Sequence, residues 1–526
     1  MIMRTTIKPY SWRVLLMIAI SMLILVGNTL AAQTSDENGL VKLEILTVND
    51  FHGALAETGK NPGAAKLVEV INETINRDAD GTILLSAGDM FQGSIDSNLL
   101  YGKSVVEVMN YARFTAMTLG NHEFDWGLDV LKARMAQANF PYVCANIIDR
   151  KTGKPVDFLK QYVMVDCKDV KIAIIGIATP ETAFKADPKI TADYSFEDPA
   201  KIVNALVPQL KKRGADIIVV LSHLGAWMDQ AGNISGEASK LALEAKGIDA
   251  VVAGHSHQIV SGKVNGIPVV EAYYNGRDVG KVELVVDRHS RKVVDSGVGV
   301  ISLPYPGLTA DAKVQEILTV AEKEIAPVKN SVLGKSVYGL SHDMVASTET
   351  VLGQWVTDAM RQKAGADIAF ENAGGLRTGI DAGNITLGKL YEVMPFENTL
   401  VTVDMTGQQV TAVLDYAIRN KKLGMVQYSG IKVVYSEAAQ GWKIIAVTLP
   451  DGTPLIPDKT YKVVINDFMA AGGDGFTVFK QGKNITETRI QMRDVMRDAL
   501  EQQKLVDFSG DDRWKLVVSS EERVVA

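Results

Sequence analysis

The sequence predicts an α/β protein of two domains, the first of them layered. From Val41 to about Val286, apolar β-favouring runs alternate with helical patterns, which is typical of an α/β domain. Several of the runs are apolar on both faces, as buried strands are. With 526 residues the chain is too long for one ordinary domain, and its 47% hydrophobic and 22% charged residues are normal for a globular protein.

Residues 1–32 have the layout of a secretory signal peptide. Arg4, Lys8 and Arg13 precede an apolar run of 13 residues at 14–26 (VLLMIAISMLILV), and residues 28–33 (NTLAAQ) offer small residues for cleavage. The run is shorter than the ~20 residues of a spanning helix. No Cys follows the run and no apolar tail closes the chain, which argues against lipid anchors. We expect export to the periplasm, cell surface or medium, without stable membrane insertion after cleavage.

The charge balance disfavours nucleic acid polymers as partners. The formal net charge is −7, and residues 1–32 carry three basic groups and no acidic group, so the chain without them carries about −10. Such a surface repels polyanions. Small anionic substrates can still bind where metal ions supply local positive charge.

The two cysteines, Cys144 and Cys167, fall at or near predicted strand ends. An exported chain can form a disulfide, so these two could pair. Two buried free thiols are the alternative, because free Cys is commonly buried.

The predicted elements divide the chain into three parts after the leader. A domain at 41–305 contains helical patterns at 63–77 and 198–213. A linker, LPYPGL (303–308), leads into a helix at 309–327, begun by Thr309 and ended before Pro327, within a connecting segment at 306–331. A second α/β domain follows at 332–526. The predicted strands of the first domain are Leu43–Val48, Thr82–Ala87, Phe114–Leu119, Lys171–Ile177, Asp216–His223 and Asp249–Gly254.

Polar clusters follow most of these strands directly. They read NDFHG, GDMFQG, GNHEFD, SHLG and GHSH, and in open α/β sheets ligands bind beyond the carboxyl ends of strands. Of only seven His in the chain, five stand at these strand ends. Together with nearby carboxylates they indicate a metal site rather than five separate structural His. The candidate residues are Asp50, His52, Asp89, Asn121, His122, His223, His255 and His257.

These residue types suit a pair of divalent ions. A carboxylate has two oxygens and can bridge two metals, while neutral His nitrogens and an Asn carbonyl fill other positions. The mixture favours Zn, Mn or similar ions over Mg or Ca alone. Two ions about 3.5–4 Å apart stabilise the attacking and leaving oxygens of a phosphoryl transfer, and lower the pKa of bound water to about 7.

Five motifs in order resemble those of the calcineurin-like metallophosphoesterases, in the version found in the exported 5′-nucleotidase/UDP-sugar hydrolase family. They are DFHG (50–53), GDMFQGS (88–94), GNHEFD (120–125), SH (222–223) and GHSH (254–257). The resemblance implies an α-β-β-α sandwich, a linker helix and a second α/β domain. It implies one metal on Asp50, His52, Asp89 and His257, and another on Asp89, Asn121, His223 and His255, with Asp89 bridging.

The same resemblance assigns a role to two further residues of GNHEFD. His122 would face the phosphate and stabilise charge or protonate the leaving oxygen, and Asp125 would fix its tautomer. From the residues alone, Asp125 could instead be the N-cap of a helix.

Three glycine-containing stretches of the second domain resemble the family's nucleotide-binding domain: ENAGGLRTG (371–379), MPFENT (394–399) and NDFMAAGGDGF (466–476). Turn chemistry and ordinary core packing are the alternatives. The resemblance implies that Phe396 and Phe468 stack on the base, with the site formed between the domains and closed by domain rotation. Asn372 would contact the base, Asp474 the ribose and Arg377 a phosphate. One departure is Ala346, where the family commonly has a phosphate-contacting Arg.

We therefore expect an exported two-metal phosphohydrolase that releases phosphate from nucleotides, foremost nucleoside 5′-monophosphates. The alternatives are a 2′,3′-cyclic nucleotide 2′-phosphodiesterase/3′-nucleotidase, a UDP-sugar hydrolase, a thiosulfohydrolase, and a non-catalytic nucleotide-binding surface protein. Metal identity, base preference and the choice between monomer and dimer stay open.

Overall fold

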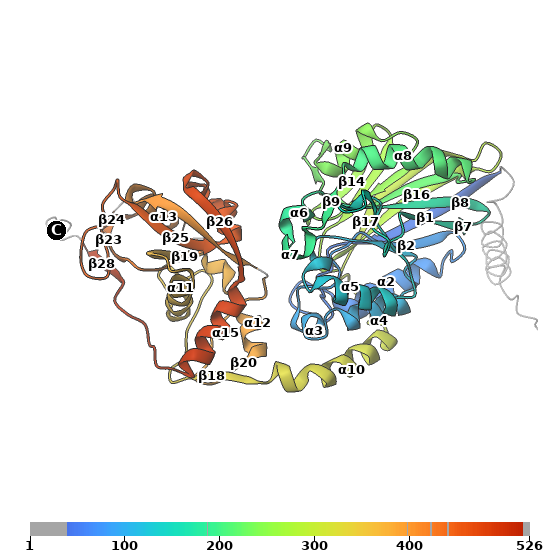
Figure 1. Ribbon diagram of the computed structural model, residues 1–526. Coiled ribbons are helices and arrows are strands. Elements are labelled where there is room, and N and C mark those ends of the chain that lie inside the picture. Colours follow the sequence, from blue (N-terminus) through green and yellow to red (C-terminus); the bar gives the residue numbers. More distant parts are fainter. Residues whose placement is uncertain (1–38, 187, 397, 421–422, 439–440, 519–526) are drawn as a thin grey trace, which may run out of the picture. The chain divides into compact units, whose positions relative to one another are not determined.

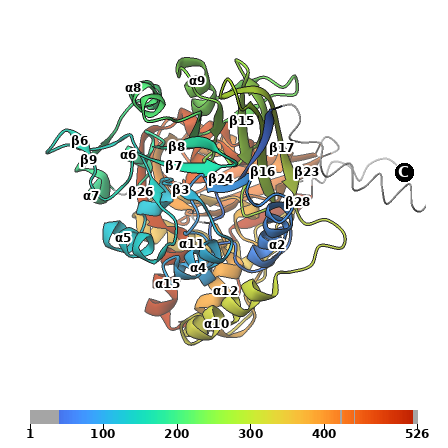
Figure 2. The same ribbon diagram turned by 90° about the vertical axis from the view of Figure 1, so that its right-hand side faces the viewer.

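The computed structural model describes residues 39–518, apart from 187, 397, 421–422 and 439–440. The expected signal peptide lies outside the described residues. The chain forms two compact units, one containing residues 39–90 and 105–315 and the other residues 91–104 and 316–518. Figures 1 and 2 give two views of the chain.

The first unit is built on two six-stranded sheets. The inner strands of each sheet are parallel, and antiparallel strands flank them on one or both sides. The first sheet runs in the order β17 (Lys292–Ser302), β16 (Asp278–Asp287), β1 (Leu40–Val48), β2 (Thr82–Ser86), β3 (Ala116–Thr118), β4 (Tyr142–Val143). The second runs β14 (Ile259–Val264), β15 (Ile267–Ala272), β13 (Ala250–Val252), β10 (Ile217–His223), β8 (Val170–Ala178), β7 (Tyr162–Cys167).

Successive side chains of each central strand are buried on opposite faces of the sheet. In β10, Val219 packs into the core between the two sheets, whereas Val220 packs under α8 (Pro199–Lys212) and α9 (Glu237–Glu244). The helices α2 (Gly63–Ile75), α4 (Lys103–Tyr111) and α5 (Gly127–Gln137) lie on the other side of the sheets in both views (Figures 1 and 2). The predicted α-β-β-α sandwich is therefore confirmed, and strands apolar on both faces are its cause.

Smaller elements complete the first unit. A three-stranded sheet and a hairpin of two strands stand apart from the main sheets. These elements are β5 (Ile147–Asp149), β6 (Lys154–Pro155), β9 (Tyr194–Phe196), β11 (Trp227–Met228), β12 (Ile234–Ser235), α6 (Thr182–Lys185), α7 (Pro188–Thr191) and the 3-10 helix η1 (His122–Phe124).

The predicted connecting helix is present, but both of its predicted ends are wrong. Helix α10 spans Ala312–Lys329, and Asp311 rather than Thr309 caps it, accepting the N–H of Val314 at 2.9 Å. Pro327 lies inside the helix. It stands in the last turn, where the missing N–H removes only one helical bond, so the helix continues for two more residues.

The second unit is also layered α/β. Its main sheet runs β22 (Gln427–Ser429), β19 (Ile368–Glu371), β25 (Thr460–Asn466), β21 (Thr399–Thr406), β26 (Lys483–Gln491). In β19, Phe370 packs into the core with α13 (Gly407–Arg419), and Ala369 packs with α11 (Val351–Ala364) and α15 (Met492–Gln503) on the other face. Helices therefore cover both faces of this sheet.

Shorter pieces complete the second unit. They are α3 (Ile95–Asn98), β18 (Val332–Ser336), η2 (Ala373–Gly375), β20 (Gly383–Thr386), α12 (Leu387–Val393), β23 (Lys432–Ala438), β24 (Gly441–Thr448), α14 (Asp467–Ala470), η4 (Gly473–Gly475), η5 (Thr477–Gln481), β27 (Leu505–Val506) and β28 (Trp514–Val518). Of the two structures weighed for the cysteines, the free thiols are present: Cys144 and Cys167 are both buried and unpaired. Within the described part of the chain, no helix is long and apolar enough to cross a membrane.

Candidate two-metal centre and nucleotide site

The candidate ligands of the first unit stand at the carboxyl ends of its parallel strands. Asp50 and His52 follow β1, Asp89 follows β2 and Asn121 follows β3 in the first sheet. From the second sheet come three His: His223 is the last residue of β10, and His255 and His257 follow β13. The carboxyl ends of parallel strands lie at the same edge of a sheet, so the polar residues that follow the strands of each sheet lie near one another.

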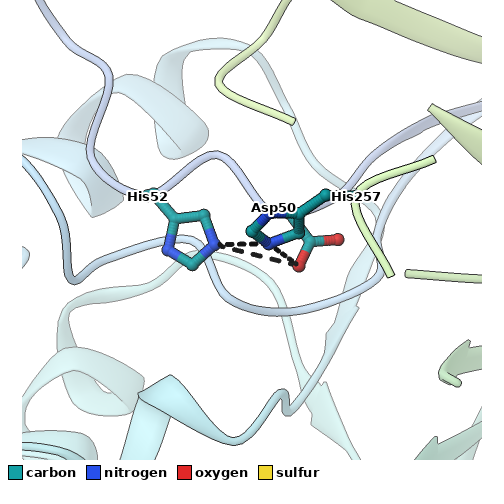
Figure 3. Close-up of side chains that lie close together, drawn as sticks. All are labelled: Asp50, His52 and His257. Carbon is teal, nitrogen blue, oxygen red and sulfur yellow. Dashed lines mark hydrogen bonds and ion pairs between the residues drawn. The ribbon is translucent and has the colours of Figure 1, made fainter. Parts of the chain in front are cut away.

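Three of these residues form the first group, which Figure 3 shows in close-up. The Nε2 atoms of His52 and His257 lie 3.1 Å apart. Asp50 Oδ1 is 3.2 Å from Nε2 of His257 and 3.9 Å from Nε2 of His52. The other oxygen, Asp50 Oδ2, accepts the N–H of His255 at 2.9 Å, so Oδ1 is the atom turned toward the two rings.

The second group contains Asp89, His223 and His255. His223 Nδ1 hydrogen-bonds the carbonyl of Ala87 at 2.7 Å, which directs Nε2 to within 3.1 Å of Asp89 Oδ2. His255 Nε2 lies 3.1 Å from a carboxylate oxygen of Glu181. Metal-bound His commonly gives its second ring nitrogen to a carboxylate or a backbone carbonyl, so both contacts fit metal ligands.

Three buried atoms in these groups fit a role as ligands rather than as hydrogen-bonding partners. Asp50 Oδ1, Asn121 Oδ1 and His223 Nε2 are buried and make no hydrogen bond of good geometry within the described structure. Buried polar atoms are rarely left without partners. Carboxylate and imidazole atoms that lie together, with a buried amide oxygen at a neighbouring strand end, suit divalent ions such as Zn or Mn.

Electrostatics in the chain alone also favour cations here. Burial, followed by the neighbouring His257, lowers the pKa of His52 to about 4, so its ring is neutral and has a lone pair at neutral pH. Burial alone would lower the pKa of His223, but Asp89 and Asp50 raise it to about 10. The pKa of Asp89 lies well below its usual value, because nearby His overcome the effect of burial. A metal would replace the proton that His223 holds.

The backbone at the ligands is unusual. Five of the seven predicted ligands have left-handed φ between 48° and 81°, namely Asp50, His52, Asp89, His255 and His257. Such conformations are uncommon for residues other than glycine and gather at functional sites.

His122 and Asp125 are paired as expected. His122 Nδ1 lies 2.7 Å from Asp125 Oδ2, which leaves Nε2 as the second ring nitrogen. The alternative role of Asp125 as a helix N-cap is not seen, since Trp126 occupies that position of α5. The ring of His122 lies 5.4 Å from that of His52 between centroids, so it borders the first group.

In the second unit, a hydrogen-bonded chain orients Asn372. The backbone N–H of Met469 donates to Asn466 Oδ1 at 2.7 Å, so the amide nitrogen of Asn466 is the donor to Asn372 Oδ1, at 2.8 Å. The nitrogen of Asn372 then donates to Asp474 Oδ2 at 2.9 Å. Because a backbone N–H cannot accept, these contacts fix Asn372 with its NH₂ group toward Asp474.

The other nucleotide-site candidates are exposed or partly so. Phe396 and Phe468 are each 43% exposed, which contradicts ordinary core packing for both. The Arg377 guanidinium lies 5.6 Å from the centre of the Phe396 ring. Ala346 accepts the N–H of Met425 through its carbonyl at 2.8 Å, and its side chain carries no charge that could replace the Arg expected there.

Two family models match the chain, one in its N-terminal half and one in its C-terminal half. The family model described as calcineurin-like phosphoesterase matches residues 43–259, and the model described as 5′-nucleotidase, C-terminal domain matches residues 328–481. Protein UshA of Yersinia enterocolitica is 30% identical over 513 residues, covering 89% of this chain and 92% of that protein. The chain belongs to the 5′-nucleotidase family.

The similarity to other members of the 5′-nucleotidase family covers most of the chain. A protein named 5′-nucleotidase from Vibrio cholerae is 29% identical, covering 91% of this chain and 94% of that protein. The crystal structure of a 5′-nucleotidase precursor from Thermus thermophilus has a TM-score of 0.59 at 29% identity, covering 91% of this chain and 99% of that one. By contrast, the chain spans only 37%, 65% and 33% of three longer curated relatives from Bacillus subtilis and Listeria monocytogenes.

Sequence reasoning missed several buried residues that support the 5′-nucleotidase family's motifs. Glu123 stands inside GNHEFD but is not among the candidate residues that the sequence predicts there. Glu271, Asn466 and Glu371 were not singled out. A carboxylate inside a short apolar run, as Glu271 is in IPVVEA (267–272), was the available signal, since such groups are seldom buried without partners.

Proposed function

We propose that the protein is an exported two-metal phosphohydrolase that releases phosphate from nucleoside 5′-monophosphates. The observation that carries the proposal is the convergence of two ligand groups, Asp50–His52–His257 and Asp89–His223–His255, at the strand ends of one unit. Membership in the 5′-nucleotidase family supports nucleotides as the substrate class.

The proposed metal ligands divide by group. Asp50, His52 and His257 would hold one ion, and Asn121, His223 and His255 the other, with Asp89 between them. When bound, the two ions would supply a hydroxide nucleophile and stabilise the charge of the phosphoryl group. His52 is suited to binding because its ring is neutral at neutral pH.

His122 would act on the leaving oxygen. Asp125 contacts Nδ1 and thereby holds the ring in one orientation. An imidazole near the substrate can stabilise developing charge or give a proton to the departing ribose oxygen.

The second unit would recognise the nucleoside. Phe396 and Phe468 are exposed aromatic rings able to stack on a base. Asn372, fixed by Asn466, has one N–H left to donate to an acceptor on the base. Asp474 Oδ1 would accept from ribose hydroxyls, and Arg377 would bind a phosphate.

A hydrolysis screen with purified protein and added Mn²⁺ or Zn²⁺ tests this function, with phosphate measured for the monophosphates, nucleoside monophosphate for the cyclic nucleotides and UDP-sugars, and sulfate for the sulfur-containing substrate. The panel holds nucleoside 5′- and 3′-monophosphates, 2′,3′-cyclic nucleotides, UDP-sugars and a thiosulfonate ester as the sulfur-containing substrate. We expect the highest kcat/KM for a 5′-monophosphate. If another class is preferred, that class replaces nucleoside 5′-monophosphates as the proposed substrate. If no class is turned over, the proposal that the protein is an enzyme is wrong.

A further inference from the structure

Two buried carboxylates outside the ligand set each join two of the loops that carry proposed ligands. We propose that Glu123 and Glu271 are positioning residues that hold the metal ligands in place before any ion binds. One acts on the loops of the first sheet and the other on the loops of the second sheet. The inference rests on the proposed metal centre and goes beyond it, because it concerns residues that bind neither metal nor substrate.

Glu123 joins the loops after β2 and β3. Its Oε2 accepts the N–H groups of Asp89 at 2.8 Å and Gly120 at 2.7 Å, and its Oε1 accepts the N–H of Met90 at 2.8 Å. Only 4% of the residue is exposed. The proposed bridging ligand Asp89 and the segment leading into Asn121 are therefore bound to one carboxylate.

Glu271 does the same for the loops after β10 and β13. It lies in β15 and is fully buried. Its Oε2 is 2.7 Å from Ser256 Oγ and accepts the N–H of Ala226 at 3.2 Å, while its Oε1 accepts the N–H of Gln258 at 3.1 Å. Ser256 stands between His255 and His257 in the sequence, so the carboxylate fixes the loop that supplies one ligand to each group.

The backbone of these loops explains why fixing is needed. Asp89, His255 and His257 have φ values of 53°, 81° and 54°, a region that side-chain-bearing residues rarely adopt. Such conformations persist only when surrounding bonds hold them. A buried carboxylate that accepts several N–H groups is a strong restraint, because a buried N–H donor that loses its acceptor is costly. Burying a carboxylate is otherwise unfavourable.

Metal affinity separates positioning from simple stability. The variants Glu123→Gln and Glu271→Gln keep the side-chain shape but turn an NH₂ group toward at least one N–H donor. We expect each to weaken binding of Mn²⁺ or Zn²⁺ about 10- to 100-fold, the usual effect of removing a group that orients a metal ligand. Calorimetric titration of the full metal-free chain with each ion alone measures this, and thermal unfolding without metal reports stability.

Asp249→Asn is the matched control. Asp249 also accepts a backbone N–H, that of Ile218 at 2.8 Å, but at the opposite end of β10 from His223. We expect it to leave metal affinity unchanged, because the amide oxygen of Asn can still accept this N–H and the contact lies far from the ligands along the strand. Affinity in Glu123→Gln and Glu271→Gln that equals the control would overturn the inference.

A milder pair of variants decides the matter if a Glu variant does not fold. Ser256→Ala removes one hydroxyl that contacts Glu271, and Ser239→Ala removes a buried hydroxyl that donates to Ile234 instead, at 2.8 Å. We expect weaker metal binding in the first only, and equal affinities would contradict the role of Glu271. A wild-type chain that binds no metal would overturn the proposed function as well, whereas normal wild-type binding with unchanged variants overturns this inference alone.

Discussion

The left-handed backbone of five proposed ligands is the clearest feature at the residue scale. Each such conformation costs roughly 1–3 kcal/mol for a residue with a side chain. Their gathering at one edge therefore indicates that geometry at the site was favoured over local stability. Asp474 in the second unit has the same feature, with φ of 51°, so both proposed binding regions contain strained backbone.

Replacing Asp89 tests the bridge. Asp89→Asn should abolish turnover and reduce bound metal, because a neutral amide bridges two cations poorly. The amide keeps the size of the side chain, and Oδ1 can still accept the N–H of His122. Metal analysis together with kinetics checks this. An active Asp89→Asn variant with two full equivalents of metal would refute the assignment.

His122 should behave differently from the ligands. We expect His122→Ala to keep both metals and to lose about 10²- to 10⁴-fold in kcat, the usual effect of a positioned acid–base group. The reason is that its Nδ1 pairs with Asp125, which is not a proposed metal ligand. Metal content measured beside kcat decides the role, since loss of metal would make His122 a ligand.

At the scale of elements, strongly patterned segments were predictable and the ends of elements were not. Runs such as Leu43–Val48 and Asp216–His223 became β1 and β10 because they are apolar on both faces. Helix α10 was predicted to stop before Pro327 but passes through it, since local propensity could not show that one lost bond is tolerated in a last turn. Strands of two residues, such as β11, form only because a partner strand pairs with them, and two residues are too few to show an alternation of apolar and polar side chains.

In the candidate site, too, some residues were predictable from the sequence and others were not. His and Asp at strand ends were found because they stand in motifs directly after strands. Glu271 and Asn466 escaped notice because the partners that connect them to the proposed sites are more than ten residues away in the sequence, as with Asn466 and Asn372. Hydrogen bonds between distant segments leave no spacing to recognise. The assignment of individual ligand and substrate roles stays a prediction, as do the domain boundaries at 41–305, 306–331 and 332–526.

Replacing Asn466 tests whether its hydrogen bond to Asn372 orients the proposed base contact. In Asn466→Ser the hydroxyl can still cap α14, since Ser is a good N-cap, but the donor to Asn372 is lost. A hydrogen bond contributes about 0.5–1.5 kcal/mol, which corresponds to about a 2- to 12-fold rise in KM for nucleotides. Steady-state kinetics measures it. An unchanged KM would show that the orientation of Asn372 does not matter to binding.

At the scale of the whole molecule, the two units have separate proposed roles. The proposed chemistry belongs to the metal centre of the first unit, and the proposed nucleoside recognition to the second. The two activities should therefore respond to mutation separately. A substrate without a base, such as p-nitrophenyl phosphate, reports on the metal centre alone.

Phe468→Ala tests that division. Stacking on an aromatic ring contributes ~1–3 kcal/mol per base. We therefore expect KM for nucleoside monophosphates to rise about 5- to 150-fold, while p-nitrophenyl phosphate turnover barely changes. Kinetics on both substrates provides the answer. Equal loss on both would mean that the variant damages folding, and no loss on either would contradict nucleotide recognition by the second unit.

Metal stoichiometry measured beside activity tests the central claim most directly. The wild-type chain is stripped of metal, titrated with Mn²⁺ or Zn²⁺, and assayed at each step for phosphate release from a nucleoside 5′-monophosphate. The account predicts no activity in the stripped protein and full recovery only as the second equivalent binds. Phosphate release that survives complete metal removal, or that is complete at one equivalent, would contradict it.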